Sequence, residues 1–317
     1  MQFLDVRTDF AFKKVFGSIE SKNILLSFLN AIIVFPNNQK IKDLTIVDPY
    51  NIPMIKGMKD TFVDVKAILE NEEIVIVEMQ VLNHDGFEKR VLYNAAKNYS
   101  SQLKKGERYH LLNPVIALTI TDFVMFEESK KIITNFKLLE KEEFIDYSDD
   151  IELIFVELPK FNKKLDELQD IKDQWIYFLK NAGELNYIPK NIDEEIQKAL
   201  QVANKACMSE EELEAQHKRK DFIYIQKAAI SLAERTGLVR GMEQGLEKGL
   251  EQGLEKGLEQ GLEQGLEQGL IRGKAEGVEQ GAKKEKLAIA KNLLDILDNE
   301  TISMKTGLSI EDIELLR

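Results

Sequence analysis

Four polar side chains interrupt two short apolar segments in a pattern that could support metal-dependent chemistry. Asp64 and Lys66 lie two residues apart in one segment, and Glu78 and Gln80 lie two apart in the next. Residues i and i+2 of a strand share a face, so we expect each pair to share one. A buried carboxylate without a partner is costly, so a metal ion or a basic side chain should lie beside it. Two adjacent carboxylates suit Mg²⁺, with positions left for water and phosphate oxygens. The alternative is that they are ordinary surface carboxylates.

The loop between the two segments decides whether the carboxylates meet. A two-residue turn at 71–72 would place Asp64 opposite Met79 and would leave Glu78 on the other face. A three-residue loop at 70–72 places Asp64 directly opposite Glu78, with Cβ atoms about 5 Å apart. The metal-site hypothesis therefore predicts an odd-length loop, and side chains on opposite faces would contradict it.

A basic helix is predicted directly after the second segment. Its apolar positions, Leu92, Ala95, Ala96, Tyr99 and Leu103, predict the buried face. The opposite side forms one polar stripe, which suits an anionic backbone but is also typical of an ordinary solvated face. The residues of this stripe are Arg90, Asn94, Lys97, Ser101, Lys104 and Arg108.

The elements that must position these residues follow from the hydrophobic spacing. Apolar residues three and four apart predict helical structure over 8–34 and 86–105, and apolar runs predict strands between and after them. An order of helix, strand, hairpin, helix and strand predicts an α/β fold with a mixed sheet flanked by helices. From about residue 160 only helices are predicted, over 163–181 and 193–236. The predicted strands are 41–49, 61–69, 74–82, 114–121 and 151–158.

A tetrapeptide repeat of Gly-Leu-Glu-Gln/Lys follows, with glycine at every fourth position from Gly241 to Gly281. On an α-helix four residues turn about 400°, so the glycine and leucine stripes drift slowly around the axis. A period above 3.6 favours a right-handed wrap if such helices associate. Interior glycine and stacked glutamates weaken an isolated helix. A marginally helical spacer and a self-association helix are therefore both open.

Composition excludes several classes of protein. Hydrophobic residues make up 44% of the 317 residues and charged residues 31%, a balance that supports a folded core. The single cysteine, Cys207, excludes a disulfide framework. The net charge of −12 argues against a general nucleic-acid coat, but the first 110 residues carry 15 Lys and Arg against 14 Asp and Glu. With no apolar run long enough for a membrane span and no signal-peptide core, we expect a cytoplasmic, non-membrane protein.

Several motifs together resemble the PD-(D/E)XK nuclease superfamily, and more closely the recombination-promoting nuclease (Rpn) and transposase family of bacteria. The Asp64…Glu78-x-Gln80 core carries the superfamily likeness, and the glycine-leucine-glutamate repeat is similar to tails in that family. The other landmarks are Thr8-Asp9-Phe10-Ala11-Phe12-Lys13, Arg90-x-x-Tyr93-Asn94, Leu112-Asn113-Pro114-Val115-Ile116, Glu157-Leu158-Pro159-Lys160-Phe161, Trp175-x-Tyr177-Phe178-Leu179 and Thr306-Gly307-Leu308-Ser309-Ile310-Glu311.

The resemblance implies a restriction-endonuclease-like core in which Asp64 and Glu78 bind Mg²⁺ or another divalent cation that activates water. Gln80 occupies the position where the superfamily usually has lysine, and glutamine brings no positive charge to the transition state. Lys66 is the candidate to supply that charge. Asp9 and Lys13 complete the expected site as an acidic helper and a phosphate contact, unless they form only an ordinary i,i+4 ion pair.

The predicted function is a metal-dependent DNA endonuclease of low sequence specificity, in recombination, mobile-element biology or defence. One alternative is a catalytically weak scaffold that self-associates through the repeat, and another is a transposase. The expected DNA contacts are Lys13, Arg90, Lys97 and Lys104. The expected parts are a nuclease core at 1–160, a helical extension at 161–236, the repeat spacer at 237–282 and a C-terminal helical pair at 283–317.

Overall fold

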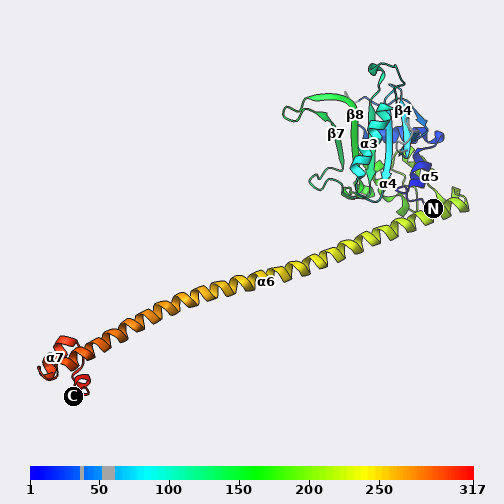
Figure 1. The fold of residues 1–317 in the computed structure, drawn as a ribbon. Helices are drawn as coiled ribbons and strands as arrows, with labels where there is room; N and C mark the ends of the chain where they lie inside the picture. The colour runs from blue at the N-terminus through cyan, green and yellow to red at the C-terminus, as the bar shows by residue number, and fades with distance from the viewer. Residues whose placement is uncertain (36–38, 52–60) are drawn as a thin grey trace. The chain divides into compact units, whose positions relative to one another are not determined.

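The computed structural model describes residues 1–35, 39–51 and 61–317 (Figure 1). Two compact units make up the chain, Met1–Ser231 and Leu232–Arg317. The first unit contains the whole sheet and the helices packed on it, and the second contains most of one long helix and two short ones.

A six-stranded mixed sheet forms the centre of the first unit, in the order β1-β4-β5-β6-β8-β7. The inner strands β5, β6 and β8 run parallel, whereas β1 with β4, β4 with β5, and β7 with β8 are antiparallel. A second sheet holds β2 (Tyr50–Asn51) and β3 (Thr61–Phe62). The bounds of the large sheet are β1 Leu44–Val47, β4 Val65–Leu69, β5 Ile74–Gln80, β6 Val115–Thr121, β7 Ile133–Leu139 and β8 Asp146–Glu157.

Helices cover both faces of this sheet, which explains why β5 and β6 are apolar on both sides. Val75 and Val77 of β5 pack into the larger core with Phe12. Ile74 and Ile76 of the same strand pack into a second cluster on the other face. The larger core holds residues of α1 (Asp9–Phe16), α2 (Lys22–Ile32), α4 (Ile171–Asn181) and α5 (Glu194–Val202), and the second cluster is covered by α3 (Phe87–Ser100).

Aromatic packing joins the N-terminal helices to α4. Trp175 and Phe178 are fully buried against Phe16 and Phe28, with ring centroids 5.6 Å apart for Trp175 and Phe28. The indole N–H of Trp175 donates to the Ser27 hydroxyl at 3.2 Å, which satisfies its polar atom inside the core. This cluster fixes α1 against the sheet, and α1 carries residues of the candidate site.

The predicted α/β fold with a mixed sheet is confirmed, and each predicted strand segment contains or overlaps an observed strand. The predicted helix over 8–34 is divided into α1, a short 3₁₀ turn and α2. Strand β7 was missed because it lies in a charged connection and at the sheet edge, where only its pairing with β8 identifies it. The hairpin loop has the predicted odd length, because Leu69 N–H donates to Glu73 O and leaves 70–72 between them.

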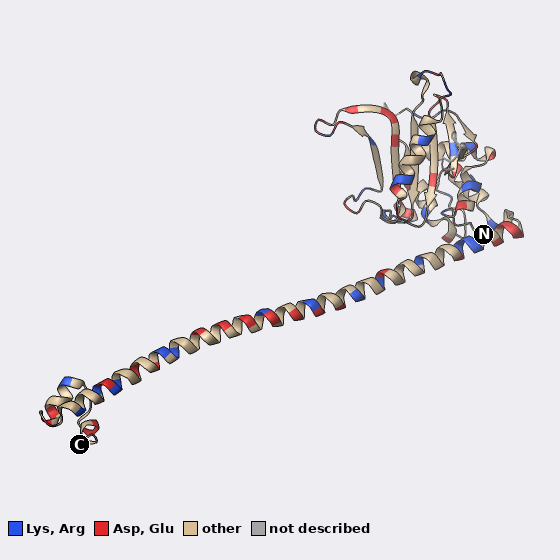
Figure 2. Cartoon of the chain, in the orientation of Figure 1, with Lys and Arg blue, Asp and Glu red and all other residues tan. Residues whose placement is uncertain are grey.

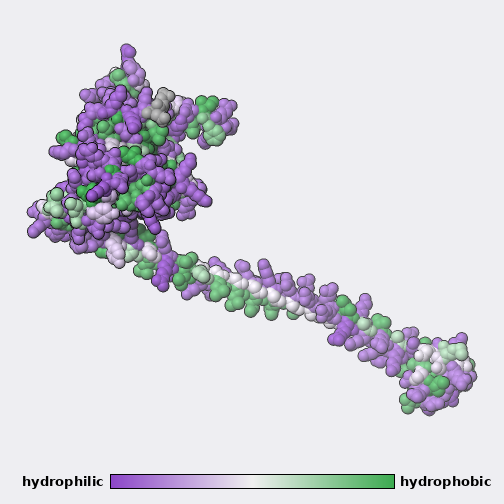
Figure 3. Space-filling model, turned by 180° about the vertical axis from the view of Figure 1, so that it is seen from behind, coloured by the Kyte–Doolittle hydropathy of each residue, from purple (hydrophilic) through white to green (hydrophobic). Residues whose placement is uncertain are grey.

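The long helix α6 runs from Glu210 to Leu293 and includes the whole glycine repeat. Within the second unit α7 (Asn299–Thr306) and α8 (Ile310–Glu314) pack on its last turns through Ala290 and Ile302. Basic and acidic residues, blue and red in Figure 2, are interspersed along α6. Apolar side chains form an exposed band on the same helix (Figure 3). Among the described residues no helix has the length and apolar character of a membrane span.

Candidate active site

A polar cavity of about 320 Å³ opens where β4 and β5 separate at one end of the hairpin. All four predicted acidic and amide residues line it: Asp64, Glu78 and Gln80 from the hairpin, and Asp9 from α1. The other lining residues come from the N-terminal segment, the strand ends, α3 and α6: Arg7, Lys13, Phe62, Met79, Val81, Leu82, Arg90, Arg219 and Ile223.

Asp64 lies at the point where the β4–β5 ladder is interrupted. Its backbone N–H donates to Val77 O at 3.1 Å, although Val77 is the register partner of Val65. Two residues opposite one is the pattern of a β-bulge. The Asp64 carboxylate then accepts the Met79 backbone N–H at 2.8 Å. The bulge therefore turns the carboxylate toward the end of the ladder, where it caps a strand donor.

The charge of Asp64 is only partly balanced. The side chain is 8% exposed, and Lys13 Nζ lies 3.3 Å from its Oδ1. Lys13 also lies 3.7 Å from Asp9 on the same helix. Burial raises the pKa of Asp64 to about 7, and the neighbouring Asp9 carboxyl adds to this rise. A buried carboxylate of this kind favours an additional positive charge.

Glu78 is held from the other helix layer. Its carboxylate pairs with Arg90 Nη2 and lies 3.5 Å from the Asn94 amide nitrogen, both on α3. Burial raises the pKa of Glu78 even though Arg90 opposes the shift. Asn94 is buried, and its Oδ1 has no hydrogen-bond partner among the described residues.

The predicted pairing of Asp64 opposite Glu78 is not formed, although the odd loop length is confirmed and the strands pair from Ile68 with Ile74 to Val65 with Val77. Asp64 contacts α1, which covers one face of the sheet, and Glu78 contacts α3, which covers the other. The bulge is the physical reason, because it removes Asp64 from the alternation that would have placed it beside Lys66. By the criterion stated above, a metal site built on a face-to-face pair is contradicted. Both carboxylates still line one cavity, so the site proposed below is a different one, which they reach from different directions.

Lys66 and two of the four expected DNA contacts are not brought to this cavity. Lys66 pairs with Val47 of β1, and burial lowers its pKa despite the nearby Asp48. Lys97 is only 6% exposed, whereas Lys104 is exposed beyond the end of α3. Lys13 and Arg90 do line the cavity.

The predicted faces of α3 are confirmed only in part, since Ala95 is buried as expected but the polar stripe is not wholly solvent-facing. Asn94 and Lys97 of the stripe are buried, and Leu92, predicted to be buried, is 52% exposed. The buried face instead includes Phe87 and Val91. The buried face is shifted toward the polar stripe because Arg90 and Asn94 contact Glu78, which the sequence could not show.

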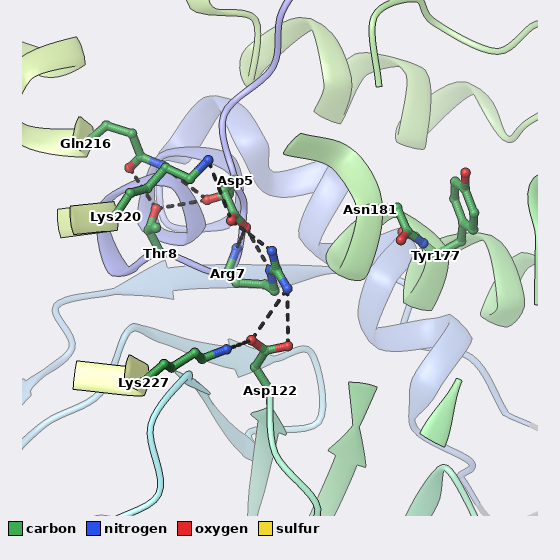
Figure 4. A network of polar contacts seen from close by, with 9 residues as sticks. All are labelled: Asp5, Arg7, Thr8, Asp122, Tyr177, Asn181, Gln216, Lys220 and Lys227. Carbon is green, nitrogen blue, oxygen red and sulfur yellow. Dashed lines mark hydrogen bonds and ion pairs between the residues drawn. The ribbon is translucent and has the colours of Figure 1, made fainter. Parts of the chain in front are cut away.

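Residues from α6 were not predicted for the site, and no local signal marks them. Arg219 and Ile223 line the cavity, although more than 130 residues separate them from Gln80 along the sequence. A polar network fixes this part of α6 (Figure 4). Gln216 bonds Thr8 at 2.7 Å, and Lys227 bonds Asp122 at 2.6 Å.

Arg7 extends the same network to the cavity. Its guanidinium bonds Asp5 at 2.9 Å and Asp122 at 3.3 Å (Figure 4). These two acidic partners raise the pKa of Arg7, chiefly through the Asp5 hydrogen bond. The N-terminal segment, the end of β6 and the first turns of α6 are therefore joined beside the candidate site.

The donor set fits a hard divalent cation held partly by water. Asp64 and Glu78 offer carboxylate oxygens, and burial raises the pKa of both groups because it disfavours their charged forms, which a nearby cation would stabilise. Within the described residues no group of three or more His, Cys, Asp or Glu side chains is placed to bind a metal. Mg²⁺ commonly uses one or two carboxylates plus waters and phosphate oxygens, so two protein ligands are sufficient.

Comparison with known proteins gives one match. Residues 6–233 match the family model described as PD-(D/E)XK nuclease family transposase. This range is more than half of the chain and contains every residue that lines the cavity. No curated protein and no solved structure matches the chain.

Proposed function

The chain belongs to the PD-(D/E)XK nuclease family transposases, and from that premise we propose that it is a divalent-metal-dependent DNA endonuclease of low sequence specificity. The observation that carries the proposal is the cavity in which Asp64 and Glu78 meet the cationic side chains of Lys13 and Arg90. Acidic groups suit a metal, and basic groups beside them suit a phosphodiester.

Asp64 and Glu78 would bind the cation, proposed to be Mg²⁺, with Asp9, which lines the same cavity, as a further carboxylate. A bound divalent cation supplies a more acidic water and neutralises charge on the phosphate. Asp9 itself is half exposed and already lies 3.7 Å from Lys13, which suits an auxiliary position.

The chain's own side chains would bind and orient the phosphate. Lys13 and Arg90 reach the cavity from α1 and α3, so they can contact non-bridging oxygens from two sides. Hydrolysis forms one bond from a water oxygen to phosphorus and breaks the bond from phosphorus to one sugar oxygen. The water loses a proton to solvent, and the leaving oxygen takes one up.

Low specificity follows from the kind of contact proposed. Lysine and arginine contacts to phosphate position a duplex but carry no sequence information. We place the activity in recombination, mobile-element biology or defence, in keeping with the transposase description of the family. The transposase reading is the second candidate, and strand transfer after cleavage would distinguish it.

Self-association through α6 is proposed as an accompanying property, and it is also the basis of the scaffold alternative. The leucines of the repeat are 66–76% exposed, and they form part of the apolar band in Figure 3. Exposed leucine at regular spacing favours pairing with another helix of the same kind. These residues are Leu246, Leu250, Leu254, Leu258, Leu262, Leu266 and Leu270.

Incubation of the full chain with supercoiled plasmid tests the proposed function. We expect nicked and then linear DNA with Mg²⁺, and none of either product with EDTA. Circular single-stranded DNA and RNA of matched length test the substrate class. Intact plasmid with Mg²⁺, Mn²⁺ and Ca²⁺ alike would contradict the nuclease and would favour the scaffold.

A further inference from the structure

Arg90 joins the acidic and amide groups of the motif through one nitrogen. Its Nη2 pairs with Glu78 and donates to Gln80 Oε1 at 2.8 Å. The guanidinium also packs 5.2 Å from the Phe87 ring centroid, on the first turn of α3. Arg90 therefore places a fixed positive charge directly beside Gln80, where the resemblance to the superfamily leads us to expect a lysine.

Gln80 is oriented so that it holds this charge. Its Nε2 donates to Leu82 O at 2.7 Å, and this bond turns Oε1 toward Arg90. Both functional atoms of the amide are thus engaged by the protein. In this arrangement Gln80 positions a guanidinium and does not itself carry the charge.

Two other cations are less suited to the same task. Lys13 is shared between Asp64 and Asp9, and Lys66 is not among the described residues that line the cavity. Arg90 lines the cavity, and its side chain is 36% exposed. An arginine has five N–H donors, of which Nε–H is buried and Nη2 is bonded to Glu78 and Gln80, so a phosphate would be met by the exposed part of the guanidinium.

We propose that Arg90 is the catalytic cation of this site, contacting the scissile phosphate, and that Gln80 is the positioning residue that orients it. The proposal rests on the proposed nuclease function. Arg90, on α3, would supply the positive charge that Gln80, at the end of β5, does not carry. This charge would stabilise the negative charge that develops on the phosphate oxygens.

Charge relocation tests the proposal in the full chain. Arg90→Gln removes the charge, and Arg90→Gln/Gln80→Lys returns one at the strand position. We expect Arg90→Gln to lower the single-turnover kcat for plasmid cleavage at least 100-fold with KM changed less than threefold. The double variant should cleave at least tenfold faster than Arg90→Gln. Lys89→Gln, an exposed neighbour on α3, is the matched control and should keep the wild-type rate.

A purely structural role for Arg90 predicts different results. Arg90→Gln would then show a weaker circular-dichroism signal of folded structure or a lower Tm. The double variant Arg90→Gln/Gln80→Lys would restore neither the cleavage rate nor the stability. A double variant no faster than Arg90→Gln, or a loss confined to KM, overturns the proposal.

Binding of inorganic phosphate gives a readout that does not need cleavage, so failure of the nuclease function can be told apart from failure of this proposal. We expect phosphate to raise the Tm of wild type and Lys89→Gln, to raise that of Arg90→Gln clearly less because only Lys13 remains, and to regain its effect in the double variant. An equal phosphate-induced Tm rise in wild type and Arg90→Gln overturns the role of Arg90, whether or not the wild type cuts DNA.

Discussion

The Asp64 carboxylate accepts the backbone N–H of Met79 at 2.8 Å, in the place where a regular ladder would offer the Val63 carbonyl. The side chain proposed to bind a metal is thus built into the hydrogen bonding of β4 and β5. The bulge that makes this possible also breaks the alternation of the strand. The backbone N–H of Met79 therefore holds the Asp64 carboxylate in place, and Lys13 partly balances its charge.

The raised pKa of Asp64 predicts a cost to stability that is relieved by Asp64→Asn. Because the pKa of Asp64 is about 7 in the folded chain and 3.8 in the unfolded chain, the folded state is favoured at low pH, where the carboxyl is neutral. This contribution to the free energy of unfolding is fully present below pH 3.8 and is lost as the pH rises through about 7. At pH 8 without metal, we expect Asp64→Asn to be more stable than wild type by on the order of 2 kcal/mol. Urea denaturation in EDTA at pH 5 and pH 8 measures this.

The gain should shrink at pH 5, where wild-type Asp64 is largely protonated. Asp85→Asn, which changes an exposed aspartate, serves as the control and should behave as wild type at both pH values. Equal stability of wild type and Asp64→Asn at pH 8 would mean that the Asp64 charge is already balanced.

Arg219 is predicted to contribute to DNA binding from α6. Its guanidinium lies 5.5 Å from the Phe222 ring centroid and lines the cavity. We expect Arg219→Ala to raise KM about 3–10-fold with kcat nearly unchanged, because one phosphate contact is lost. The rise should diminish at high salt, and plasmid cleavage at 50 and 200 mM NaCl measures it. Lys218→Ala, on the neighbouring exposed position, should leave KM unchanged.

The polar network beside the cavity predicts a stability loss on substitution of Asp122. This carboxylate binds both Arg7 and Lys227, and its side chain is only 9% exposed. Asp122→Asn leaves Lys227 without its charge partner and Arg7 paired with Asp5 alone, so we expect a loss of about 1–3 kcal/mol in the free energy of unfolding. Thermal and urea unfolding measure it, with the exposed Asp149→Asn as control. An unchanged unfolding free energy would mean that the network does not hold the start of α6.

The strands and the hairpin loop could be predicted from the sequence, and the detailed site could not. Apolar runs and loop length are local properties. They explain why the pairing of β4 with β5, from Ile68 opposite Ile74 to Val65 opposite Val77, agrees with the loop length expected from the sequence. The bulge at Asp64 depends on a side chain that competes with the ladder for Met79, which no spacing rule reveals. The face of α3 depends on Arg90 meeting Glu78, and the contribution of Arg219 depends on contacts across the whole unit.

The exposed leucines of α6 predict self-association that charge should disrupt. We expect wild type to form a concentration-dependent oligomer by sedimentation equilibrium, and Leu254→Glu/Leu258→Glu to sediment as a monomer, because each charged side chain would be buried in the contact. Gln252→Glu/Gln260→Glu adds the same charge away from the leucine stripe and should keep most of the association. A monomeric wild type across the concentration range would contradict the role of the stripe.

Plasmid cleavage by wild type, Asp64→Ala and Glu88→Ala, each with Mg²⁺ and with EDTA, tests the central claim most directly. Glu88 is an exposed carboxylate at the start of α3, so its removal controls for loss of charge alone. The metal-dependent nuclease predicts cleavage by wild type and Glu88→Ala with Mg²⁺ only, and a loss of at least 100-fold for Asp64→Ala. Cleavage that persists in Asp64→Ala or in EDTA would contradict a metal site built on Asp64.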